Sequence, residues 1–392
     1  MIDKLRAEFE NVYFSNVSTT KGLENLAINI GVSKNSLRRF LGKIKNDSQL
    51  RMSTLNLISA RLGYKNFQDF CESSNSNLPT MDFELLEIYY GIVKGKGTTL
   101  NESRFQKANY YFAQKILNNP NDLKEFIKRF SENEEALEYV FAWHPSYHHI
   151  AHEDYQEALL KLAKISSKAH VKVFAYSFVY FGKFMSENLK IEEADHLMNA
   201  IEKSVAKMKK ESGDFMAFPE ARYIIAKYIH TNLHSQKADG NEAPAPYKFK
   251  SLNENCGVLF SEQLIFRTYV SNILNVLRYY EKADQYFTEI PSEKKLKNFA
   301  EENHHLKAHL YLYKITRAIT LFKLSKKKES LAIFDSLPID INDSQTFSFD
   351  SKIYFELQYY FLGQQLYPKR KDFRERFEIL VQRTQFTYLN KI

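Results

Sequence analysis

The chain has 392 residues, a formal net charge of +8 and a low content of glycine (12) and proline (9). So few turn-forming residues exclude most all-β and doubly wound folds and predict an all-α protein, and the length suggests more than one domain. The sequence shows no membrane-spanning apolar run, no signal-peptide pattern and only two cysteines, Cys71 and Cys256. We therefore expect a cytoplasmic protein that does not insert into a membrane.

Hydrophobic spacing of three and four residues predicts five short helices at the N-terminus. They cover residues 2–13, 22–30, 33–42, 53–63 and 66–71. The apolar face of the first helix consists of Ile2, Leu5, Phe9 and Val12. Ser33 and Ser53 are the expected N-caps of the third and fourth helices. The serine- and proline-containing stretch that follows predicts a domain boundary near residue 78.

Positive charge is concentrated within these helices. Between Ser33 and Lys65 the sequence holds eight lysines and arginines and one acidic residue, Asp47. This composition is typical of an element that binds nucleic acid, although a solvated basic helix face has the same composition.

The stretch LAINIGVSKNSLRRFLG, residues 26–42, has the residue types that two crossing helices need when the second lies in a DNA groove. Ala27 suits the crossing and Gly31 suits the turn, while the expected apolar lock consists of Val32, Leu37 and Phe40. Arginine can pair with guanine, asparagine with adenine, and lysine with phosphate. The DNA-binding candidates are therefore Lys34, Asn35, Ser36, Arg38, Arg39, Lys43 and Lys45.

In its apolar and glycine positions this stretch resembles the lambda-repressor-like helix-turn-helix family. Residues 53–70 are also similar to the fourth and fifth helices of bacterial heads of this kind. The resemblance implies a five-helix helix-turn-helix DNA-binding domain over residues 1–78. Two alternatives remain open: a head of this fold that contacts protein, and a chance similarity of one helical hairpin.

The remaining residues repeat one pattern. Residues 180–201, 270–291 and 317–338 each read as an apolar helix, a polar turn, a small residue and, four positions later, a bulky residue. The small and bulky pairs are Ala194 and Met198, Ala283 and Phe287, and Ser330 and Phe334, with Ala158 and Leu162 in a partial copy. Twelve positions before each complete pair stands another small residue, namely Gly182, Ser271 or Ala318. Small residues allow two antiparallel helices to approach closely.

This pattern resembles the tetratricopeptide repeat and implies a degenerate α-helical-repeat solenoid over residues 79–392. The irregular spacing of the repeats keeps a compact helical bundle as the alternative. In a solenoid of this kind Thr268, Asn272 and Asn275 would line the concave groove, where asparagine amides can bind an extended peptide. Ordinary polar residues on an exposed helix face would give the same sequence.

Nothing in the sequence indicates an enzyme, a metal site or a cofactor. Histidines cluster at His144, His148, His149 and His152, and two pairs with helical spacing are His230 with His234 and His305 with His309. Such pairs can chelate a metal, but no glutamate directly follows the first histidine, so polar surface histidines are the favoured interpretation.

The layout is similar to bacterial regulators that join a helix-turn-helix head to a tetratricopeptide body. It implies a transcriptional regulator that binds double-stranded DNA in a sequence-specific way. The body would bind a peptide or protein ligand or mediate homodimerisation. The alternative is a protein-interaction adaptor whose head does not bind DNA.

Overall fold

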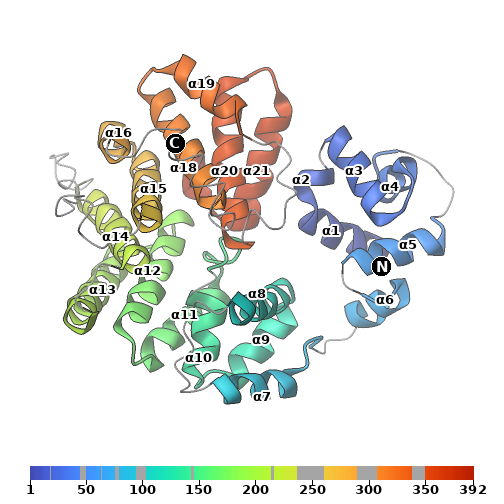
Figure 1. The fold of residues 1–392 in the computed structure, drawn as a ribbon, viewed down its shortest axis with the longest axis horizontal. Helices are drawn as coiled ribbons and strands as arrows, with labels where there is room; N and C mark the ends of the chain where they lie inside the picture. The colour runs from blue at the N-terminus through green and yellow to red at the C-terminus, as the bar shows by residue number, and fades with distance from the viewer. Residues whose placement is uncertain are drawn as a thin grey trace. The chain divides into compact units, whose positions relative to one another are not determined.

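The computed structural model describes residues 1–17, 19–44, 50–62, 64–75, 79–93, 103–142, 145–212, 216–235, 260–288, 307–337 and 349–392. Within these ranges all regular structure is helical and no strand occurs, which confirms the all-α prediction (Figure 1). The described residues divide into two compact units, unit 1 before Phe83 and unit 2 from Phe83 onwards. No helix within the described ranges combines the length and the apolar character needed to cross a bilayer.

Unit 1 contains the five expected helices with shifted ends and one additional short helix. The elements are α1 (Ile2–Val12), α2 (Phe14–Val17), α3 (Thr20–Ile30), α4 (Lys34–Phe40), α5 (Met52–Arg61) and α6 (Phe67–Asn75). The additional helix, α2, lies between the first two expected helices, and it packs against α1 and α3 with Val17 buried. A single helical turn is too short to show a hydrophobic period.

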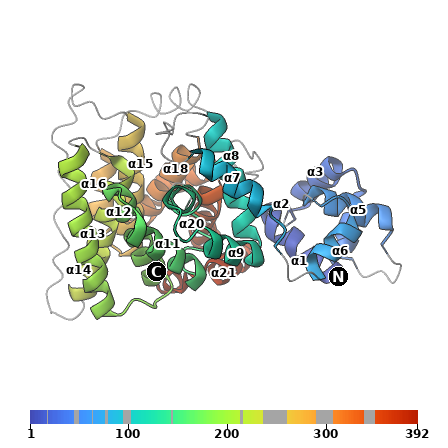
Figure 2. The same ribbon diagram turned by 90° about the horizontal axis from the view of Figure 1, so that it is seen from below.

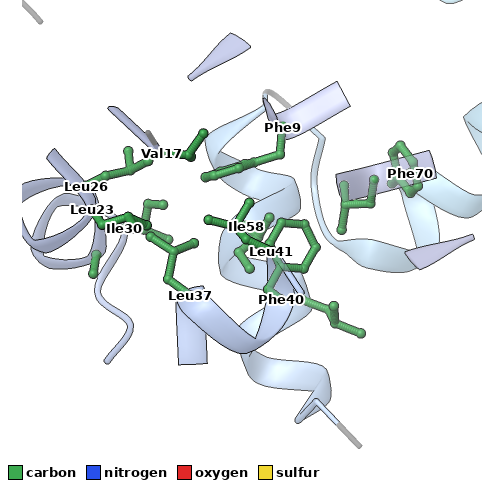
Figure 3. Packing of buried hydrophobic residues seen from close by; sticks show 13 residues of the cluster. Phe9, Val17, Leu23, Leu26, Ile30, Leu37, Phe40, Leu41, Ile58 and Phe70 are labelled. Atoms are coloured by element: carbon green, nitrogen blue, oxygen red, sulfur yellow. The ribbon is translucent and has the colours of Figure 1, made fainter. Parts of the chain in front are cut away.

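A single apolar cluster forms the core of unit 1, and Figure 3 shows it at close range. The rings of Phe9 on α1 and Phe40 on α4 meet edge to face with their centroids 5.5 Å apart. The inward face expected for α3 is confirmed, since Leu23, Leu26, Ala27 and Ile30 are all buried.

Two predictions for unit 1 are wrong. Val12 is 47% exposed, because α1 ends at this residue and the ring of Tyr13 packs against Phe9 instead, with the centroids 4.8 Å apart. Ser53 does not cap the fourth helix. That helix, α5, begins at Met52 with Arg51 at the N-cap position and no side-chain cap, so Ser53 lies inside its first turn.

Unit 2 begins with α7 (Phe83–Val93), α8 (Ser103–Asn118), α9 (Pro120–Arg129) and α10 (Glu134–Leu137), which continues as the π-helical turn η1 (Glu138–Ala142). The next helices are α11 (Glu153–Ile165), α12 (Ala169–Met185), α13 (Ile191–Ser212), α14 (Ala217–Ser235), α15 (Phe260–Val276) and α16 (Tyr280–Thr288). The described chain ends with α18 (Lys307–Lys323), α19 (Lys327–Asp335), α20 (Phe349–Leu366), α21 (Lys371–Thr384) and the 3₁₀ turn η3 (Thr387–Lys391).

The long helices of unit 2 pack in two layers (Figures 1 and 2). Helices α12, α14, α15, α18 and α20 contact one another in succession, and we call them the inner layer. Helices α13, α16, α19 and α21 pack against α12, α15, α18 and α20 respectively. Helices α12, α15, α18 and α20 are therefore each followed along the chain by an outer partner.

Small residues of the repeated pattern lie at close contacts between segments of unit 2. The hydroxyl of Ser271 on α15 donates to the carbonyl oxygen of Ala283 on α16 at 3.4 Å, and that of Ser330 on α19 donates to Ala318 on α18 at 2.8 Å. A Cβ atom at Gly182 on α12 would collide with the carbonyl oxygen of Ile150. At Gly182 a side chain is excluded for steric reasons, whereas at Ser271 and Ser330 the small side chain supplies a hydrogen bond between the paired helices.

The turns that follow α12, α15 and α18 share one geometry. Glu187, Arg278 and Ser325 each adopt a left-handed conformation with φ between 60° and 65°. The next residue in each turn donates its N–H to the carbonyl oxygen five positions earlier at 2.8 Å, and these donors are Asn188, Tyr279 and Lys326. This is the Schellman pattern of helix termination. The repeated sequence pattern thus corresponds to a repeated backbone geometry.

Candidate nucleic-acid interface and inner groove

Helices α3 and α4 meet at a sharp turn centred on Gly31. Gly31 adopts φ 81° and ψ 28°, and its N–H and that of Val32 both donate to the carbonyl oxygen of Ala27 at 3.0 Å. The hydroxyl of Ser33 then accepts a hydrogen bond from the N–H of Ser36 at 3.0 Å, which confirms Ser33 as the N-cap of α4. Because φ is positive at Gly31, a glycine favours this abrupt change of direction.

The apolar residues expected to lock these two helices do so. Ala27, Leu37 and Phe40 are buried, and Val32 packs against the same core from a half-buried position. Helix α1 supports the end of α4, since the Nε of Arg6 donates to the carbonyl oxygen of Phe40 at 2.6 Å. The orientation of α4 is therefore fixed by a core on one side and a hydrogen bond at its end.

The DNA-binding candidates lie on the opposite face of α4 and directly after it. Asn35 is exposed, whereas Arg38 and Arg39 are half-buried and keep part of their surface in solvent. Two lysines are engaged within unit 1: Lys34 forms an ion pair with Glu24 on α3, and the Nζ of Lys43 donates to the carbonyl oxygen of Val17.

The two remaining DNA-binding candidates are Ser36, which the structure describes, and Lys45, which it does not. The hydroxyl of Ser36 lies 2.9 Å from that of Ser33, so this side chain takes part in capping α4. Lys45 lies outside the described residues. The sequence did not indicate the partner of Lys34, because Glu24 lies ten positions earlier on another helix.

The groove residues expected in unit 2 are buried, so the prediction of a solvent-facing groove at these positions is wrong. Asn272 and Asn275 are 2% and 4% exposed, and Thr268 is buried as well. The Nδ2 of Asn275 donates to the carbonyl oxygen of Thr316 at 3.0 Å, and its Oδ1 accepts from the hydroxyl of Thr320 at 3.0 Å. The hydroxyl of Tyr354 on α20 donates to the Oδ1 of Asn272.

Segments of unit 2 itself cover these asparagines. Asn272 and Asn275 line a cavity of about 30 Å³ that is closed in part by Leu389 and Ile392 from the C-terminal end of the chain. A space of this volume has room for a few water molecules at most, which is far less than an extended peptide occupies. The ring of Phe386 packs against that of Phe181 on α12, with the centroids 5.8 Å apart, which holds the C-terminal turn in place.

The segment that follows η1 also packs against helices of the inner layer. The ring of Tyr147 stacks on that of Tyr354, with the centroids 4.3 Å apart. The buried Arg222 on α14 donates from Nη2 to the hydroxyl of Tyr147 at 2.7 Å, and its guanidinium lies 4.4 Å from the ring of Tyr269. A buried cation is stabilised here by aromatic faces.

The described histidines of the cluster near residue 148, His148, His149 and His152, are half-buried and pack against the rest of unit 2. The Nδ1 of His149 lies 2.8 Å from the hydroxyl of Ser146, and the Nε2 of His152 lies 3.3 Å from the carbonyl oxygen of Arg383. Burial lowers the pKa of His148 well below its ordinary value and that of His149 to about 4. His144 lies outside the described residues.

Of the two histidine pairs with helical spacing, the structure describes both members of only one pair. His305 lies outside the described residues, so its pair with His309 is not described. His230 and His234 on α14 meet Asp195 on α13, whose Oδ1 lies 3.6 Å and 2.8 Å from their respective Nε2 atoms. The sequence pattern identified the two histidines but not the carboxylate, because Asp195 belongs to another helix.

Comparison of the chain with protein-family models, with curated proteins and with solved structures gives no match. The function of the chain is therefore inferred from the geometry of the two units.

Proposed function

We propose that this chain is a sequence-specific DNA-binding transcriptional regulator, with α3 and α4 as a helix-turn-helix and unit 2 as a helical-repeat body. The observation that carries the proposal is the α3–α4 pair. A left-handed glycine joins two helices over a shared core, and the second helix presents Asn35, Arg38 and Arg39 on its outer face. Amide and guanidinium groups on a helix of this kind can read base edges in the major groove.

Charge near α4 supports the proposal. Lys43 follows α4 and is exposed as a residue, and Arg51 and Arg61 are exposed around α5. Cations in these positions could contact phosphates on either side of a groove. Lys34 would exchange its ion pair with Glu24 for a phosphate contact, and Lys43 its hydrogen bond to Val17, so the net contribution of each to binding should be smaller.

The repeated hairpins of unit 2 support a body that engages a protein or peptide partner. Paired helices with a common turn and a small residue at each crossing are typical of repeat architectures, which bind partners along extended surfaces. Because Asn272 and Asn275 are buried, we do not place the partner on these residues. Homodimerisation through unit 2 would serve the same regulatory role.

The adaptor remains a second candidate because unit 1 also exposes apolar side chains. Ile28 on α3 is 76% exposed, and Met52 and Leu57 on α5 are exposed as well. Exposed apolar residues of this size are common in surfaces that contact protein. A head that uses them would not need the arginines of α4.

The test uses the full-length protein and a pool of randomised DNA duplexes. We expect selection of a preferred sequence, with a slope of log K against log salt of about −4 if each protomer makes about four phosphate contacts. Arg38→Ala should relax the sequence preference at a cost of about 1–3 kcal/mol, whereas Lys43→Ala should weaken binding to all duplexes alike.

Lys124→Ala provides the matched control, because Lys124 is an exposed lysine of unit 2. This variant should bind DNA as the parent protein does. Equal and sequence-independent losses for Arg38→Ala and Lys43→Ala would contradict base readout by α4. Absence of binding even at low salt would favour the adaptor.

A further inference from the structure

Three side chains with metal-ligating atoms converge where α13 and α14 lie side by side (Figures 1 and 2). Asp195 lies near the beginning of α13, and His230 and His234 lie near the end of α14, so the two helices run in opposite directions. The histidines are four positions apart, which places both rings on one face of α14. The group belongs entirely to unit 2 and is separate from the surface proposed for DNA.

The geometry of the group is close to that of a coordination site. The Oδ1 of Asp195 lies 2.8 Å from the Nε2 of His234 and 3.6 Å from the Nε2 of His230, and the two rings are 4.6 Å apart between centroids. Ligands about 2.0–2.2 Å from a tetrahedral ion are separated from one another by roughly 3.3–3.6 Å. Small side-chain movements that open one hydrogen bond would therefore admit an ion.

A buried tyrosine orients one of the rings. The hydroxyl of Tyr180 on α12 lies 3.0 Å from the Nδ1 of His230, so the Nε2 of this ring faces Asp195. A hydrogen-bond partner on the second ring nitrogen is characteristic of metal-binding histidines, because it fixes the ring and the tautomer. The side chains of His230, His234 and Asp195 are 25%, 42% and 52% exposed, so an ion can reach them from solvent.

We propose that Asp195, His230 and His234 bind one divalent transition-metal ion of the Zn²⁺ class. Two imidazoles and one carboxylate suit Zn²⁺, Co²⁺ or Ni²⁺, whereas Mg²⁺ and Ca²⁺ prefer sites made of oxygen ligands. With three protein ligands, a tetrahedral ion keeps one position for water. The bound ion links the end of α14 to the beginning of α13. This inference does not depend on the proposed DNA-binding function.

The experiment measures Zn²⁺ binding to the full-length protein after treatment with a chelator, by isothermal titration calorimetry. We expect one site per chain that Asp195→Asn, His230→Ala and His234→Ala each remove. Tyr180→Phe should weaken the affinity by about 10- to 100-fold, since it removes only the orienting group. His196→Ala is the matched control, because His196 is the exposed neighbour of Asp195 on α13 and lies outside the group.

Two further measurements distinguish metal binding at this site from metal binding by other histidines of the chain. Co²⁺ in place of Zn²⁺ should give a visible absorption band that is lost in Asp195→Asn, and Mg²⁺ should not compete. Far-UV circular dichroism of each variant establishes that its helices are retained. Stoichiometric Zn²⁺ binding that persists in both Asp195→Asn and His234→Ala would overturn the proposal, as would the absence of Zn²⁺ binding to the parent protein.

Discussion

Two amide side chains of α15 connect three helices of the inner layer. Asn275 exchanges hydrogen bonds with the backbone and hydroxyl groups of α18, and Asn272 accepts from Tyr354 on α20. Neither amide has access to bulk water, so each hydrogen bond replaces one that the unfolded chain makes with solvent. These residues are therefore expected to matter for stability.

Asn275→Ala should lower the free energy of unfolding by about 1–3 kcal/mol, because it removes two buried hydrogen bonds and leaves space behind. Denaturant unfolding of the full-length protein measures this change. Asn199→Ala is the control, since Asn199 is exposed on α13 and its replacement should stay within about 0.5 kcal/mol. Equal and small effects of both substitutions would mean that the amide of Asn275 is solvated.

The sequence could not reveal this burial, and the reason lies at the residue scale. A helix face with asparagine and threonine has the same pattern whether its partner is water or another polar helix face. Asn275 is satisfied by Thr316 and Thr320, which lie more than 40 positions later. For the same reason the sequence did not show that Asp195 lies beside the two histidines of α14. A third residue that comes from another helix has no characteristic spacing from them in the sequence.

At the scale of elements, the turn between α3 and α4 depends on one backbone conformation. Gly31 has φ 81°, and a Cβ atom built there would meet nothing within 4 Å. Gly31→Ala should therefore be destabilising through backbone strain alone, by about 1–2 kcal/mol. It should also weaken DNA binding, because the strain acts at the turn that sets the direction of α4.

Gly91→Ala is the matched substitution on α7. A Cβ atom at Gly91 also meets nothing within 4 Å, but the residue has no positive φ, so alanine should stabilise the helix by about 0.5–1 kcal/mol. Thermal unfolding of the two variants should thus shift in opposite directions. A shift in the same direction would show that the φ of Gly31 is not what requires glycine.

Helix positions were largely predictable because apolar residues recur at helical spacing, and Leu5, Phe9, Leu26 and Ile30 are buried as expected. Helix ends were less predictable. They depend on which cap the chain selects, and α5 begins at Met52 although Ser53 offers a better capping side chain. The short helix α2 owes its form to packing against α1 and α3 and not to its own sequence.

At the scale of the whole molecule, the closure of unit 2 depends on residues far apart in sequence. The C-terminal turn packs on α12, where the ring of Tyr388 lies 4.4 Å from that of Phe184 between centroids. A repeat pattern predicts contacts between neighbours along the chain but not a return of the last residues to an earlier helix. Leu389 and Ile392 of this returning segment line the same small cavity as Asn272 and Asn275.

The two units have separate cores, so they should unfold in separate steps. The apolar cluster of unit 1 includes only residues before Phe83, and Phe40 is completely buried within it. Phe40→Ala should destabilise unit 1 by about 3–5 kcal/mol and leave unit 2 unchanged. The only tryptophan of the chain, Trp143, stands in the sequence between η1 and α11 of unit 2, so its fluorescence should report that unit, whereas far-UV circular dichroism reports the helices of both.

In Phe40→Ala, part of the circular dichroism transition should therefore move to lower denaturant while the fluorescence transition stays in place. Ile201→Ala is the counterpart in unit 2, because Ile201 is fully buried on α13, and it should move the fluorescence transition by an amount that corresponds to about 2–5 kcal/mol. If both probes shift together in Phe40→Ala, the two cores unfold as one cooperative block, and the energetic independence inferred from their separate clusters is wrong.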